Sequence, residues 1–272
     1  MRKKKNPLLS GPFKVWTIAF TVIPLILIFY YGLTAQEDGR FTLSNILKIA
    51  TPEYRKALLL SLMLSLISTI ICLVMAYPLA YIMARAEEKV QKTFMTIIMI
   101  PMWMNFLIRT YAWMTILQDT GILNGLLAKI GLGPVHIIGT EAAVIIGMVY
   151  DYFPYMILPI YSVMAKMDVK LLEAARDLGC NSAGVLRRVI WPLSLPGVIS
   201  GVIMVLIPSI STFYISQKLG NGKFYLIGDA IEGQYAANNL HFAAAIAFIL
   251  MVILLVCMAL MQRGANKKAM VV

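Results

Sequence analysis

Six apolar runs dominate the sequence, and each is long enough to cross a lipid bilayer as a helix, for which about 20 residues suffice. We place them at residues 15–33, 57–84, 93–117, 142–164, 193–216 and 242–261. The chain is 60% hydrophobic and only 14% charged, a composition that excludes a soluble domain of 272 residues. The sequence therefore predicts an all-α polytopic membrane protein, with a transmembrane domain over residues 14–262 and tails at 1–13 and 263–272.

The basic residues indicate how the chain is oriented. If the N-terminus is cytoplasmic, the segments on that side hold 16 Lys and Arg residues and the outside loops hold 7, with Arg109 inside a run. Positive charge concentrates on the cytoplasmic side of membrane proteins, so both termini are expected there. The first run is longer than a signal-peptide core and lacks a small-x-small site, which favours an uncleaved span. Because the basic residues lie at the ends of runs, the net charge of +11 does not indicate a nucleic-acid partner.

A charged stretch over residues 165–192 separates the fourth and fifth runs. It is typical of two short helices joined at Gly179, a residue suited to the left-handed position that ends a helix. Asp168 can cap the first helix, and Asn181 or Ser182 can cap the second. The apolar residues predicted to share a face of the first helix are Leu171, Ala175 and Leu178. Such an amphipathic segment lies on the bilayer surface or docks on a partner.

The spacing within this stretch favours docking. Glu173, Ala174, Ala175 and Gly179 follow the pattern Glu-Ala-Ala-x3-Gly, and Pro192 closes the stretch. This pattern resembles the signature loop of ABC importer permeases, although Trp191 stands where that family has Leu. The resemblance implies a coupling helix that sits in a groove of a separate ATP-binding subunit. It also implies that this chain binds no cofactor, and that ATP and Mg belong to the partner; the sequence has no P-loop motif.

Two further segments narrow the family. Residues 101–113 and 149–161 are similar to the third and fourth spans of spermidine/putrescine permease subunits, and the likeness covers most of the chain from about Leu58. It is closest to the first of the two permeases in such importers. The resemblance implies a type I importer fold with six helices in the bacterial cytoplasmic membrane. The partners it implies are a second permease in a heterodimer, two ATP-binding subunits, an extracytoplasmic polyamine-binding protein and membrane lipid.

Asp151 is a charged residue inside the fourth apolar run, and its presence in a membrane helix calls for an explanation. It lies near mid-bilayer, where an ionised carboxylate costs about 2.5–3.5 kcal/mol on insertion scales. With Tyr150 and Tyr155 beside it, the site has the carboxylate and aromatic chemistry that suits alkylammonium groups. Arg109 lies at nearly the same depth in the third run, so a structural ion pair is the alternative. The two interpretations are not exclusive.

Four more residues are candidates for a substrate pathway, each with a plainer alternative. Tyr111 fits an interfacial aromatic belt, and Trp103 fits helix packing. Asp229 and Glu232 belong to the last outside loop, where they either guide a polycation or are merely solvated. We assign no metal site and no catalytic residue, since the histidines and cysteines are scattered and no nucleophile–base pair is present.

Taken together, these features predict a transport subunit that is not itself an enzyme: the permease of an ATP-driven polyamine importer that works by alternating access. One alternative is an ABC permease for another solute, such as an iron complex or an oxyanion. A second is a secondary transporter with Asp151 as its proton site, although the Glu-Ala-Ala stretch has no role in that scheme.

Overall fold

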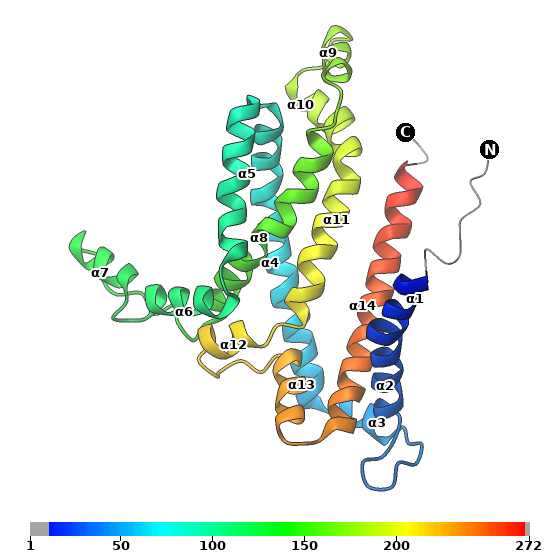
Figure 1. Cartoon of the computed structure of the whole chain (residues 1–272). Coiled ribbons are helices and arrows are strands. Elements are labelled where there is room, and N and C mark those ends of the chain that lie inside the picture. The colour runs from blue at the N-terminus through cyan, green and yellow to red at the C-terminus, as the bar shows by residue number, and fades with distance from the viewer. Residues whose placement is uncertain (1–10, 270–272) are drawn as a thin grey trace, which may run out of the picture. The chain divides into compact units, whose positions relative to one another are not determined.

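The computed structural model describes residues 11–269, and the side chains of residues 11–263 (Figure 1). The basic residues of segment 1–10 and the last three residues of the chain lie outside the described residues. Within the described part the regular secondary structure is helical, apart from one isolated bridge between Thr34 and Phe41, and loops join the helices. It divides into two compact units. The first takes residues up to Arg55 with Ala230–Ile253, and the second takes Lys56–Asp229 with residues from Leu254 onward.

Among the described residues, five helical segments are long and apolar enough to cross a membrane, and a sixth candidate is a bent pair. The helices of these segments are α1 (Gly11–Thr17), η1 (Ile18–Val22), α2 (Ile23–Gly32), α4 (Pro52–Arg85), α5 (Glu88–Trp103), α6 (Phe106–Leu117), α7 (Ile122–Lys129), α8 (Glu141–Met164), α10 (Ser182–Val185), η2 (Leu186–Ile190), α11 (Trp191–Ile210) and α14 (Leu240–Ala269). The other helices are α3 (Ser44–Ile49), α9 (Val169–Asp177), α12 (Tyr214–Leu219) and α13 (Ile227–Ala236).

In the first unit, hydrogen bonds fasten the loop after α2 to the start of α14. The Nδ1 atom of His241 lies 2.8 Å from the Thr34 carbonyl oxygen and 3.1 Å from the Thr34 hydroxyl. The side-chain amide of Asn45 donates to the same carbonyl at 3.0 Å. His241, which has no partner pattern in the sequence, therefore has a structural role.

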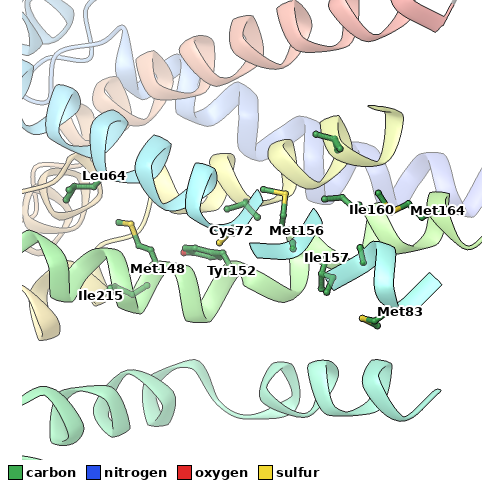
Figure 2. Packing of buried hydrophobic residues seen from close by; sticks show 14 of the residues in the cluster. Leu64, Cys72, Met83, Met148, Tyr152, Met156, Ile157, Ile160, Met164 and Ile215 are labelled. Carbon is green, nitrogen blue, oxygen red and sulfur yellow. The ribbon is translucent and has the colours of Figure 1, made fainter. Parts of the chain in front are cut away.

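The second unit is built around α8, which packs along α11. Two glycines of α11 let the backbones approach closely, as small residues do between membrane helices. A Cβ atom at Gly197 would lie 2.8 Å from the Pro159 carbonyl oxygen, and one at Gly201 would lie 2.9 Å from that of Met156. Figure 2 shows buried residues of α4 and α8, such as Cys72 and Met156, gathered in one cluster. This packing gives the unit a rigid centre.

The third apolar run, predicted as one span over residues 93–117, is not one straight helix. It breaks after Trp103, and α6 with α7 leaves α5 at an angle of 95°. Pro101 removes one N–H from the last turn of α5, and Met104 is extended (ψ 146°). The Asn105 side chain then accepts a hydrogen bond of 2.8 Å from the Leu107 N–H, which starts a new helix.

The fifth run also differs from its predicted bounds of 193–216. Its helical segment begins at Ser182, inside the stretch assigned to the coupling loop, and ends at Ile210. Pro192 cannot donate to a carbonyl one turn back, and the turn before it widens into the π-helix η2, where the Trp191 N–H donates to the Leu186 carbonyl. The loop and the membrane helix are therefore one continuous rod.

Candidate functional site

Arg109 of α6 and Asp151 of α8 form a buried ion pair. The Nη1 atom of Arg109 lies 3.3 Å from Oδ1 of Asp151, and the two side chains are 7% and 3% exposed. Each buried charge alone would be costly, and each offsets part of that cost for the other, although the two facing atoms make no hydrogen bond. The ion pair that the sequence analysis gave as the structural alternative for Asp151 is therefore present in the structure.

The aromatic neighbours of Asp151 do not all face it. The Tyr150 ring meets Trp113 edge to face at 5.3 Å between centroids, and both residues line an apolar cavity of about 460 Å³ among α4, α5, α6 and α8. Tyr155 is partly exposed. Tyr152, which sequence reasoning did not single out, is buried and donates a hydrogen bond of 3.3 Å to the Pro208 carbonyl. The aromatic residues beside Asp151 thus divide between a cavity, an exposed position and the core.

A series of aromatic rings and cations leads from Arg109 to the surface of the second unit. The Arg109 guanidinium lies 5.8 Å from the Phe106 ring centroid, and that ring is 5.9 Å from Tyr214 of α12. Tyr214 is in turn 6.2 Å from Tyr111, and the Lys218 ammonium lies over both tyrosine rings. Sequence reasoning named Tyr111 but did not connect it with Lys218. The spacing Tyr214-x3-Lys218 places these two residues on one helix face, but it does not indicate Tyr111 as their neighbour.

The remaining pathway candidates lie elsewhere. Trp103 is 74% exposed at the end of α5, directly before the break. Asp229 is not a solvated loop carboxylate: it is buried, and its Oδ2 accepts hydrogen bonds of 2.9 Å from the Ser216 hydroxyl and the Leu226 N–H. It therefore anchors the start of α13. Glu232 is an exposed residue on the same helix.

The stretch over residues 165–192 begins with the capped helix that the sequence predicts. The Asp168 side chain accepts a hydrogen bond of 3.0 Å from the Lys170 N–H at the start of α9. Gly179 has φ +82°, the left-handed conformation expected after the helix. Of the two candidate caps for the next helix, Asn181 is the one used, and its side chain accepts from the Gly184 N–H at 2.8 Å.

The buried face of α9 differs from the predicted one. Leu172 and Ala175 are the buried residues of this helix, whereas Leu171 is half-exposed and Leu178 is 86% exposed. Glu173 and Ala174 are exposed with them. These exposed residues define a surface of α9 that combines apolar side chains with one carboxylate. In Figure 1, α9 lies at the end of the second unit opposite to α6 and α12. Pro192, the last residue of the predicted motif, lies within the helical rod that carries this surface.

Together, the apolar helical segments, the bent third segment and the exposed helix between the fourth and fifth segments define a multi-pass membrane transport component. Residues 76–269 match the family described as binding-protein-dependent transport system inner membrane component, and the chain belongs to this family.

Curated relatives extend the match over almost the whole chain. The chain is 38% identical over 260 residues to a protein of Haemophilus influenzae named spermidine/putrescine transport system permease protein PotB, covering 93% of this chain and 91% of the relative. The protein of that name in Escherichia coli K12 is 36% identical over 264 residues, covering 93% and 96%.

Solved structures show the same fold. A bacterial ABC transporter described as importing the acidic polysaccharide alginate contains a chain that matches with a TM-score of 0.76 and 16% identity, covering 96% of this chain and 94% of that chain. A bacterial alginate ABC transporter in complex with an alginate-bound periplasmic protein gives a TM-score of 0.79 at 16% identity, covering 96% and 93%. The fold is therefore that of an ABC importer permease.

Proposed function

We propose that this chain is a permease subunit of an ATP-driven importer that carries spermidine, putrescine or both across the inner membrane. The observation that carries the proposal is the similarity to the spermidine/putrescine permeases, which extends over 93% of the chain. A buried carboxylate among aromatic residues, the chemistry expected for an alkylammonium cargo, supports it.

The proposed assembly has a second permease, two ATP-binding subunits and an extracytoplasmic binding protein. ATP and Mg would be held by the ATP-binding subunits, since the sequence of this chain has no P-loop motif. The excess of Lys and Arg in alternate loops supports cytoplasmic termini and, with them, a cytoplasmic position for α9.

The coupling mechanism follows from the position of α9. Its exposed surface around Glu173 and Ala174 docks on the ATP-binding subunit, while Leu172 and Ala175 anchor it to the second unit. The helical rod from Ser182 to Ile210 begins three residues after Gly179, so a displacement of α9 is delivered to the end of a membrane helix. Closure of the ATPase dimer would then tilt this rod and α8, which packs along it, and switch access from one side to the other.

Asp151 is proposed to meet the cargo in this cycle. In this structure its charge is matched by Arg109, so the cargo ammonium has to compete with a guanidinium for the carboxylate. Such competition makes binding of the cargo reversible. The carboxylate attracts the cargo ammonium, and Arg109 pairs with Asp151 again when the cargo leaves.

Uptake of radiolabelled spermidine tests the proposal. The chain is expressed with its partner subunits in cells deprived of their own polyamine importers. We expect ATP-dependent, saturable uptake that unlabelled putrescine reduces and that ferric complexes and oxyanions do not. If the assembled complex takes up no labelled spermidine or putrescine but does take up a labelled iron complex or oxyanion, the importer is retained and the polyamine cargo is rejected.

A further inference from the structure

Lys218 places its ammonium over two tyrosine rings at the end of the second unit. Its Nζ atom lies 5.4 Å from the Tyr111 ring centroid and 5.6 Å from that of Tyr214. The two rings are 6.2 Å apart and meet at 83°, and the Tyr111 side chain also hydrogen-bonds with Tyr214 and Lys218. Both distances are within the 6 Å at which a ring attracts a cation. Tyr111 is 44% exposed on the surface of this chain.

The side chain of Lys218 resembles one end of a polyamine. A lysine side chain is a primary ammonium on four methylene groups, and putrescine is the same four-carbon chain with an ammonium at each end. A pair of rings that accepts the end of Lys218 therefore has the size and the electrostatics to accept the end of a putrescine or the aminobutyl end of a spermidine. The rings would hold either cation through the same contacts.

We propose that Tyr111 and Tyr214 form an ammonium-binding site that Lys218 fills in this structure and for which a terminal ammonium of the cargo competes. The inference rests on the proposed polyamine function and adds to it an outer site, with Lys218 as a tethered competitor. It differs from the Asp151 site, which is deeply buried and has a carboxylate.

The contacts around the pair make the exchange reversible. Lys218 is only half-buried and sits on α12, a six-residue helix that ends at Leu219, so its long side chain can swing away without moving α6. An exposed cation–aromatic contact corresponds to about a two- to fivefold effect on binding, which a divalent or trivalent cargo can overcome. The tethered ammonium thus lowers the affinity of the site without closing it.

Further contacts connect the tyrosine pair with the buried Asp151. Phe106 lies between Tyr214 and Arg109, with centroid distances of 5.9 Å to the tyrosine and 5.8 Å to the guanidinium carbon. Arg109 then contacts Asp151. An ammonium released from the tyrosine pair therefore finds an aromatic surface and then the buried carboxylate, each site occupied in this structure by a cation of the chain itself.

The test uses the complete reconstituted importer with spermidine-loaded binding protein. The variant Lys218→Met keeps a side chain of similar length without the charge, Lys218→Arg keeps a cation, and Lys223→Met removes an exposed lysine of the following loop as a matched control. We expect Lys218→Met to lower the half-saturating concentration of loaded binding protein for ATP hydrolysis about two- to fivefold. Lys218→Arg and Lys223→Met should leave it unchanged.

A double-mutant comparison separates competition from a merely structural contact. In the background of Tyr111→Leu, which removes a half-exposed ring, Lys218→Met should no longer lower the half-saturating concentration. The inference is overturned if Lys218→Met leaves this concentration unchanged or raises it, or if it acts equally in both backgrounds. A wild-type importer that no polyamine stimulates would instead refute the proposed function, and the inference with it.

Discussion

Replacing one member of the Arg109–Asp151 pair should damage the protein far more than replacing both. Asp151→Asn leaves a buried guanidinium without its counter-charge, and Arg109→Met leaves a buried carboxylate. At the observed separation of 3.3 Å, and with an effective dielectric constant near 20, the Coulomb attraction is about 5 kcal/mol. Breaking a buried pair on one side costs about 3–5 kcal/mol, whereas replacing both members with apolar residues is often neutral.

The free energy of unfolding in detergent–SDS mixed micelles measures these effects. We expect each single variant to lose about 3–5 kcal/mol and the double variant Arg109→Met/Asp151→Leu to recover most of it, a coupling energy of about 3 kcal/mol or more. Glu88→Gln is the matched control, because its ion pair with Lys92 is exposed and its loss should not be measurable.

Additive losses in the double variant, or a loss below about 1 kcal/mol in both single variants, would refute the reasoning from burial. The double variant also separates stability from transport. If it folds and assembles but moves spermidine poorly, the carboxylate serves the cargo as well as the fold. Unchanged uptake would restrict Asp151 to a structural role.

The other predictions concern backbone geometry. Gly201→Ala should lower the free energy of unfolding by about 1–3 kcal/mol, because its Cβ would lie 2.9 Å from the Met156 carbonyl oxygen, whereas Gly233→Ala, which meets nothing within 4 Å, should not. Asn105→Ala should cost about 1 kcal/mol in the same assay by removing the cap at the 95° bend. Gly179→Val strains a position at φ +82° by about 1–2 kcal/mol; we expect ATP hydrolysis to continue while uptake falls, and full uptake would contradict docking through α9.

The length of an apolar run can be read from consecutive residues without knowledge of tertiary contacts. For that reason the sequence reveals most of the long helices. The runs predicted at 57–84, 142–164 and 242–261 lie within the segments Pro52–Arg85, Glu141–Met164 and Leu240–Arg263. The bend after Trp103 was not predicted, because proline and asparagine also occur in straight membrane helices, where neighbouring helices satisfy the freed backbone groups. The continuous rod through Pro192 was missed because a proline near a helix start can either begin the helix or widen a turn.

The candidate site depends more on contacts than on local pattern. Equal depths were enough to offer Arg109 as a partner for Asp151, but they did not reveal that Arg109 lies on α6, after the bend. Asp229 was misjudged because a loop carboxylate and a buried helix anchor look alike in sequence, and only the contacts with Ser216 and Leu226 distinguish them. The position of Lys218 over Tyr111 joins residues from different helices, and no spacing rule connects them.

Cargo-stimulated ATP hydrolysis would decide whether this chain serves a polyamine importer. The complete importer is reconstituted in lipid vesicles, and hydrolysis is measured with binding protein loaded with spermidine, putrescine, a ferric complex or an oxyanion, and with none. We expect stimulation by spermidine or putrescine alone. Stimulation by an iron complex or an oxyanion, with no response to polyamines, would contradict the proposed cargo. Failure of any ATP-binding subunit to associate with this chain would contradict the coupling role of α9.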